Sequence, residues 1–315
     1  MSDILSEVTG PCCLTNRPAL NLLSFAHSKP LMKRAFFFLL LLVFCKMSFA
    51  QRFHLGVFGG LAAYYGDLTD KVFPKKVTNG AIGITGNYEL TDNFMLRAGF
   101  TFARVGGADM FSSDPGRRAR NLNFETAITE FSLVGQYYLL NLYDHKFTPY
   151  GFAGVALYHF NPYTFNSAQE KVYLRPLGTE GQGIPGYSIK EYKLTQFAIP
   201  FGGGIKYAIN NNLHLGLEAG IRVLFTDHLD DVSTNYADPA DLLAYRGQIA
   251  VDLSYRGDEV PGAIPIIPGK NTQRGSPKYK DLYYFTGLHL TFRLNSGRAW
   301  TGAGSSKSAA CPTTF

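Results

Sequence analysis

Eight segments that follow Gln51 alternate apolar and polar residues with a period of two. In one of them Phe94, Leu96 and Phe100 fall on one side, and Arg97 and Thr101 fall on the other. A β-strand places two such sets on opposite faces, whereas a helix would scatter them around its circumference. The pattern therefore predicts eight strands, at residues 53–65, 80–91, 94–105, 126–140, 147–160, 196–209, 213–225 and 281–294.

The connections between these strands alternate in length. Those after the second, fourth and sixth strands are short, and the others are long loops at residues 67–78, 106–125, 161–195 and 227–280. Short turns at one rim and long loops at the other are typical of outer-membrane barrels, whose termini both lie in the periplasm. We therefore predict an all-β fold, an eight-stranded antiparallel transmembrane β-barrel (OmpA-like) with long extracellular loops and short periplasmic turns.

Charged residues of the predicted strands fall on the polar face. Arg or Lys facing lipid at the midplane costs about 2–4 kcal/mol in such barrels, so this face is expected to line the lumen. An eight-stranded barrel has room for little more than its own side chains, and unpaired buried charge is costly. We expect a lumen filled by ion pairs rather than an open pore, with a network of Glu89, Arg97, Glu130, Lys206, Glu218, Arg222 and Arg293, and with His289 on the same face. Gly202 and Gly204 are expected to relieve crowding beside larger neighbours.

The segments outside the barrel suggest export. Residues 32–50 combine a basic start, a short apolar run and small residues before position 51, which is typical of a secretory signal peptide. Residues 1–31 are interpreted as an over-extended upstream segment, 51–294 as the barrel and 295–315 as a disordered tail. We expect Sec-dependent export to the cell outer membrane. Cys311 is the one cysteine after residue 50, so no disulfide is expected within the mature chain.

Aromatic residues gather near the predicted strand ends. Amphipathic rings favour the headgroup level of a bilayer, so this placement predicts two interfacial girdles. The alternative is that they are ordinary core aromatics. The residues are Tyr64, Tyr65, Phe73, Tyr137, Tyr138, Tyr143, Tyr158, Phe160, Tyr163, Tyr283 and Tyr284.

Candidate chemistry is sparse. The histidines are spread over different strands and loops, and no GxSxG-type nucleophile elbow accompanies them. The acids Asp227, Asp230, Asp231, Asp238 and Asp241 suggest either a Ca²⁺ site or a solvated loop, and the spacing of an EF-hand is lacking. The net charge of +6 is scattered, without a basic run. We expect no enzyme, no cofactor, no metal and no nucleic-acid partner; Arg256-Gly257-Asp258 is interpreted as an ordinary loop.

Several segments are more specific than a generic barrel. They are Tyr65–Leu68, Arg120–Leu122, Phe147–Tyr150, Pro176–Gly183, Pro200–Gly202, Thr226–Tyr236, Arg274–Gly275 and Asp281–Tyr283. With them, the chain resembles a group of Bacteroidota outer-membrane barrels that in part includes the PorG component of the type IX secretion system. The resemblance implies a non-enzymatic barrel that docks periplasmic secretion machinery. Relatives usually end with the last strand, whereas this chain continues after Leu294.

Two functional hypotheses follow. The first is a structural or docking component that binds other secretion or envelope proteins, through its long loops or its periplasmic rim, as well as outer-membrane lipid. The loops are favoured because loops carry function more often than their scaffold. Its candidate interaction residues are Gly178, Thr179, Glu180, Gly181, Asp230, Asp231 and Tyr236. The alternative is a small-solute channel or transporter. The residues indicate no particular small-molecule ligand.

Overall fold

The computed structural model describes residues 52–69, 77–262, 267–278 and 280–294. The upstream segment, the signal peptide, the tail, Phe73 and all four cysteines lie outside these residues. The predictions made for them therefore stay predictions.

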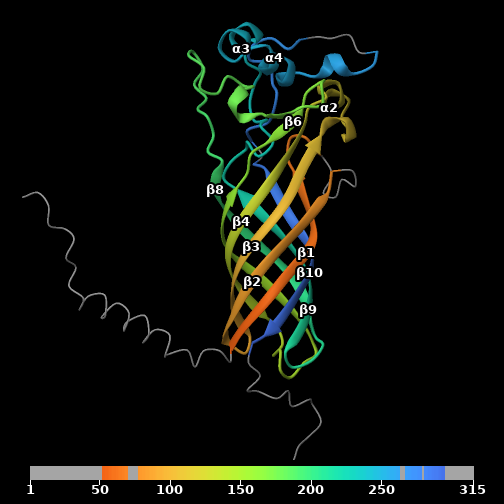
Figure 1. The fold of residues 1–315 in the computed structure, drawn as a ribbon, viewed down its shortest axis with the longest axis vertical. Helices are drawn as coiled ribbons and strands as arrows, with labels where there is room; N and C mark the ends of the chain where they lie inside the picture. The colour runs from red at the N-terminus through yellow and green to blue at the C-terminus, as the bar shows by residue number, and fades with distance from the viewer. Residues whose placement is uncertain (1–51, 70–76, 263–266, 279, 295–315) are drawn as a thin grey trace, which may run out of the picture. The chain divides into compact units, whose positions relative to one another are not determined.

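The described chain forms a closed barrel of eight long antiparallel strands (Figure 1). Each strand pairs with its neighbours along the chain, and the last strand pairs with the first, which closes the sheet. This confirms the predicted fold of the outer-membrane type. The strands are β1 (Phe53–Tyr65), β2 (Asn79–Thr91), β3 (Phe94–Ala108), β4 (Asn123–Tyr138), β5 (Phe147–His159), β8 (Thr195–Ala208), β9 (Leu213–Leu224) and β10 (Leu282–Arg293).

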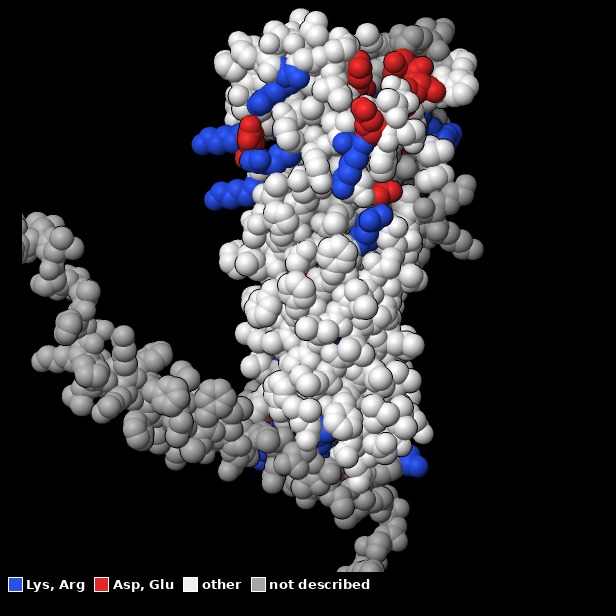
Figure 2. All heavy atoms as spheres, in the orientation of Figure 1, with Lys and Arg blue, Asp and Glu red and all other residues white. Residues whose placement is uncertain are grey.

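Burial along the strands follows the predicted period of two. Outward apolar side chains are exposed, such as Ile82 at 67% and Phe197 at 65%, while inward charged side chains such as Glu130 and Arg97 are buried. On the face shown in Figure 2 the barrel wall is almost entirely uncharged, and charged residues gather over the loops. An apolar belt around a polar interior is what lipid requires of a barrel.

Glycines inside the barrel make room for larger neighbours, as predicted for Gly202 and Gly204. A Cβ on Gly202 would lie 2.8 Å from the ring of Phe152, and one on Gly204 would lie 2.9 Å from that of Tyr150. Such distances are too short for packed carbon atoms, so these rings need glycine opposite them.

The two rims differ as the connection lengths predicted. The β2–β3, β4–β5 and β8–β9 turns lie at the rim where β1 begins and β10 ends (Figure 1). At the other rim the long loops contain structure that was not predicted: the helices α2 (Pro115–Arg120), α3 (Pro239–Arg246) and α4 (Gln248–Ser254), the short strands β6 (Tyr163–Phe165) and β7 (Lys171–Tyr173), and the 3-10 turns η2 (Asp109–Phe111), η3 (Arg175–Leu177) and η4 (Gly257–Glu259). We call residues 109–122, 160–194 and 225–281, where described, the cap.

The cap has an apolar core. Leu177, Leu229 and Leu253 of the loops belong to one buried cluster with Tyr64 and Tyr158, which face inward at the tops of their strands. The long loops therefore pack onto the inner side chains at the mouth of the barrel.

The aromatic girdles are only partly present. Tyr65 and Tyr137 are exposed, at 40% and 56%. Seven of the predicted girdle residues are instead buried: Tyr64, Tyr138, Tyr158, Phe160, Tyr163, Tyr283 and Tyr284. The girdle prediction is wrong for these seven, because position near a strand end does not decide which face a residue occupies. Tyr64 and Tyr283, for example, point inward and donate hydrogen bonds to Asp230 and Glu130.

Candidate functional site

The middle of the lumen is occupied by a bidentate ion pair between β3 and β9. Arg97 Nη1 lies 2.5 Å from Glu218 Oε2, and Nη2 lies 3.0 Å from Oε1. The hydroxyl of Tyr150 donates to the same carboxylate at 2.7 Å. Both charged side chains are less than a tenth exposed. Two parallel hydrogen bonds fix the geometry of this pair and satisfy most of its polar atoms.

A second pair lies nearer the cap. Arg222 Nε donates to Glu130 Oε2 at 3.1 Å, and Tyr283 donates to the same oxygen at 2.8 Å. The guanidinium of Arg222 also lies over the ring of Phe285, with its Cζ 4.1 Å from the ring centroid. This layer therefore combines an ion pair with a cation–π contact.

A third cluster lies toward the short-turn rim. Glu89 receives a hydrogen bond from Tyr143, lies 2.6 Å from His54 Nε2, and lies 3.7 Å from Arg293 Nη2. Lys206 donates to the hydroxyl of Tyr138 at 2.6 Å. Of the seven network residues, the structure joins six as acid–base pairs and places Lys206 against a tyrosine. The buried His289 hydrogen-bonds Thr85, with 2.7 Å between its Nε2 and the Thr85 hydroxyl.

In the cap, the structure brings the two candidate interaction segments together around one carboxylate. Glu180 accepts hydrogen bonds from the backbone N–H of Ser233 at 2.8 Å and of Thr234 at 3.0 Å. The Thr234 hydroxyl donates at 2.7 Å, and Arg274 Nη1 completes the shell at 3.1 Å. The side chain of Glu180 is 0% exposed. A buried carboxylate with four donors holds three parts of the cap in register.

The glycines of the first segment follow from this arrangement. Gly178, Gly181 and Gly183 have φ values of +57°, +88° and +72°. A side chain is strained in that region, and a Cβ on Gly181 would lie 2.3 Å from the ring of Tyr187. The turn that presents Glu180 therefore needs glycine at these positions.

Acids of the last loop are buried as well. Asp231 accepts from Thr179 at 2.6 Å and from Tyr192 at 2.7 Å, and burial raises the pKa of its carboxyl. The Tyr64 hydroxyl lies between Asp230, at 2.5 Å, and Asp281, at 3.0 Å. Burial and the neighbouring carboxylate raise the pKa of Asp230 well above its usual value.

The expectation of a solvated acidic loop is therefore wrong for Asp227, Asp230 and Asp231, which are at most 3% exposed. Within the described residues, no group of three or more His, Cys, Asp or Glu side chains is arranged to hold a metal ion. Asp238 caps the start of α3 by accepting from Ala240 N, and Asp241 accepts from Tyr187.

The candidate interaction residues thus lie in the interior of the cap. Thr179, Glu180, Asp230 and Asp231 are at most 1% exposed, and Tyr236 is 5% exposed. Their hydrogen bonds are with other residues of the cap and, for Asp230, also with Tyr64 of β1. Arg256 of the Arg-Gly-Asp tripeptide is also largely buried and pairs with Glu259, with 2.9 Å between Nε and Oε1.

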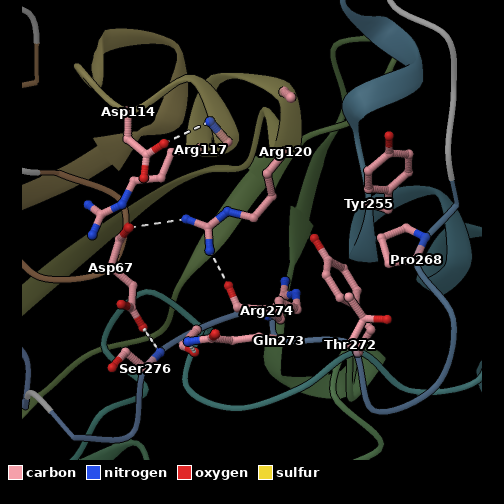
Figure 3. Close-up of a pocket in the computed structure, with 14 residues that line it drawn as sticks. Asp67, Asp114, Arg117, Arg120, Tyr255, Pro268, Thr272, Gln273, Arg274 and Ser276 are labelled. Atoms are coloured by element: carbon pink, nitrogen blue, oxygen red, sulfur yellow. Dashed lines mark hydrogen bonds between the residues drawn. The ribbon is translucent and has the colours of Figure 1, made fainter.

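A cleft of about 590 Å³ opens on the cap beside this cluster (Figure 3). Arg117 and Arg120 of α2 line one side, and Tyr255 and Pro268 line the other. This site was not predicted from the sequence. Its residues come from three separate loops, and nothing local in the sequence signals their meeting.

Comparison with known proteins gives one family match. Residues 33–178 match a family model described as "Domain of unknown function (DUF6089)". No curated protein matches the sequence. Among the part of the chain that the structure describes, no helix is long and apolar enough to cross a membrane.

Several solved structures are similar to the chain. Neisserial surface protein A is 10% identical with a TM-score of 0.38, over 76% of this chain and 96% of that chain. The outer membrane protein OprG from Pseudomonas aeruginosa is 12% identical with a TM-score of 0.36, over 77% and 97%. The attachment invasion locus protein Ail of Yersinia pestis is 7% identical with a TM-score of 0.35, over 77% and 99%.

Proposed function

We propose that the protein is a non-enzymatic barrel of the cell outer membrane that acts as a docking component and binds another envelope protein through its cap. The apolar outer belt supports a lipid environment, and the long loops support an external cap. The position of both barrel ends at the short-turn rim supports periplasmic termini after Sec-dependent export.

The observation that carries this proposal is the folded cap. Glu180 and Arg274 lock two loop segments by contacts that are almost completely buried, and an apolar core lies beneath them. A surface held rigidly in this way loses little conformational entropy when a partner binds. The predicted interaction segments then act by holding the cap in shape.

The outermost helices offer a contact surface. Leu243 and Tyr245 of α3 are 52% and 56% exposed, and Ile249 of α4 is 37% exposed. These helices lie at the end of the barrel away from the short turns (Figure 1), so lipid does not account for their apolar surface. Exposed apolar groups outside the membrane favour a protein interface.

The partner we propose is a component of a type IX protein secretion system, on the resemblance to the barrel group that includes PorG. Because the cap is external, this component is exposed at the outer face of the membrane, in contrast to the periplasmic machinery that the resemblance implies. Affinity isolation of the tagged protein from native membranes is expected to recover a secretion component, and a deletion strain is expected to secrete less. Replacing Leu243 and Tyr245 with Ser should reduce recovery, while Met110→Ser, at another exposed apolar position of the cap, serves as the control. Intact secretion in the deletion strain together with no recovered component would refute the proposal.

The filled lumen argues against the alternative, a small-solute channel. Paired side chains such as Arg97 and Glu218 occupy the barrel interior, where an eight-stranded wall leaves little other room. In planar bilayers the purified protein should show no unit conductance. Stable conductance whose ion selectivity changes in Arg97→Gln would establish the channel instead.

A further inference from the structure

The cleft on the cap has the size and shape of a ligand site. Its volume of about 590 Å³ falls in the range of about 300–1,000 Å³ that is usual for small-molecule pockets. Figure 3 shows the labelled side chains converging on it from α2, from the segment of residues 272–276 and from the region of Tyr255 and Pro268. Hydrogen bonds from Arg120 and Ser276 to Asp67 hold the three loops together, so the site is already formed without a ligand.

The three arginines that line the cleft differ in their partners. Arg120 is held by Asp109, with both nitrogen–oxygen distances at 2.7 Å, and also donates to the backbone oxygen of Asp67. Arg274 is held by Glu180. These two guanidinium groups are structural.

Arg117 is different. Its guanidinium makes no hydrogen bond or ion pair with any residue that the structure describes, and its Nη1 is enclosed without a partner. Its positive charge acts on the carboxyl of Asp67. Arg117 is half-buried in the wall of the cleft, so the accessible part of its guanidinium can pair with an acidic group of a ligand.

The rest of the lining combines aromatic rings with groups that both donate and accept hydrogen bonds. Tyr236 and Tyr255 lie edge to face, with ring centroids 6.4 Å apart. Thr272 and Ser276 contribute hydroxyls, and Asp114 contributes a carboxylate. An aromatic face attracts the polarised C–H bonds of a sugar ring, and hydroxyls suit a lining of mixed donors and acceptors.

We propose that this cleft binds an acidic saccharide, whose sugar ring packs against Tyr255 and whose carboxylate, phosphate or sulfate group pairs with Arg117. The inference goes beyond docking and does not depend on it. An acidic peptide is the competing ligand. Its backbone would need an ordered row of donors and acceptors, such as a strand edge, and the cleft instead presents side chains from separate loops.

The test uses the purified full-length barrel in phosphatidylcholine nanodiscs and isothermal titration calorimetry. The probes are an oligogalacturonate tetrasaccharide, the uncharged maltotetraose, tetraglutamate and inorganic phosphate. We expect the oligogalacturonate to bind at least about tenfold more tightly than each of the other three, as a hydrogen-bonded charge pair predicts.

Variants separate the two halves of the site. Arg117→Gln should weaken oligogalacturonate at least about tenfold and leave maltotetraose nearly unchanged, whereas Tyr255→Leu should weaken both sugars about fivefold. Arg104→Gln removes the same charge from an exposed side chain outside the cleft and should have no effect. The heat-dependent gel shift of a folded barrel checks that each variant has kept its fold.

Several results would overturn the proposal. They are equal binding of the acidic and neutral sugars, equal effects of Arg117→Gln and Arg104→Gln, or tighter binding of tetraglutamate or of phosphate alone. The acidic saccharide has two sources, a free polysaccharide and the sugar head of lipopolysaccharide. If lipopolysaccharide in the nanodisc weakens the binding of oligogalacturonate to the wild type, the cleft binds the sugar head of the lipid. If the affinity for oligogalacturonate is unchanged, the cleft binds a free polysaccharide.

Discussion

The lumen and the cap both bury acids, but they neutralise them differently. In the lumen, Glu218 and Glu130 each face an arginine across the barrel. In the cap, Asp227, Asp230 and Asp281 are buried with hydroxyl and backbone donors as their hydrogen-bond partners. The lumen is thus a set of matched charges, whereas the cap combines the ion pairs of Glu180 with Arg274 and of Asp109 with Arg120 with further acids that depend on protons and hydrogen bonds. This difference makes the wall a permanent scaffold and the cap the part that conditions and ligands can alter.

The largest effect is expected from breaking a lumen pair. Arg97→Met leaves Glu218 buried and unpaired, which should lower the free energy of unfolding by about 3–5 kcal/mol. Urea titration of the barrel in lipid vesicles, followed by far-UV circular dichroism of the strands, measures it. Adding Glu218→Leu should restore most of the loss; a double variant as unstable as Arg97→Met would show that the pair is not the reason.

Breaking the ion pair of Arg274 and Glu180 in the cap should destabilise only the nearby loops. Arg274→Met removes one of the four donors to Glu180, so we expect a cost of about 1–3 kcal/mol confined to the loops. Hydrogen exchange should increase at Ser233 and Thr234 while the strands stay protected. Equal loss of protection in β3 and β9 would show that cap and wall unfold as one unit.

The cap should loosen as pH rises. Burial raises the pKa of Asp227 to about 6 and raises those of Asp230 and Asp281 well above their usual values, so the closed cap binds more protons than the open one. Its stability is then complete below about pH 4 and falls as pH rises through the raised values. Burial lowers the pKa of His228. This residue therefore has the opposite effect, since it makes the cap more stable as pH rises in the range below about pH 6.5.

Comparing the wild type with Asp281→Asn isolates the carboxyl contribution to this pH dependence. Protease cleavage of the loops should accelerate with pH in the wild type and much less in the variant. If the wild-type cap instead becomes more resistant to protease than the Asp281→Asn cap as pH rises, the predicted direction of the pH dependence is wrong.

The smallest effect is expected at the exposed pair of Arg104 and Glu125, whose charged atoms lie 3.9 Å apart. Pairs of this kind contribute at most about 1 kcal/mol because water and salt screen them. Arg104→Gln should therefore shift the urea midpoint barely at all. A loss as large as that of Arg97→Met would remove the distinction between buried and exposed pairs.

The wall could be predicted from the sequence because strand periodicity is local. Successive side chains of a strand point to opposite faces, so the position of a residue along its strand decides its face. The inward placement of Arg97 and Glu218 could therefore be predicted without knowing the partner strand. Strand ends were less certain: β3 ends at Ala108 rather than Val105, and β4 begins at Asn123 rather than Thr126. Turn and loop residues at these positions carry little periodic signal.

The cap could not be predicted in the same way. Its helices are six to eight residues long, too short for a clear helical period. Glu180 contacts Ser233 and Arg274, which lie 53 and 94 positions further along the chain. The segments that contain Glu180 and Asp231 were predicted as interaction loops, but their burial was not predicted, because nothing in their composition indicates it.

In this protein the cap binds the partner, and the lumen only supports the cap. The most direct measurement is quantitative affinity isolation from native membranes, comparing the wild type, Arg274→Met and the Arg97→Met/Glu218→Leu double variant at equal amounts of folded barrel. We predict that the double variant recovers partners as the wild type does and that Arg274→Met recovers far fewer. Loss of partners in the double variant with full recovery by Arg274→Met would contradict the account.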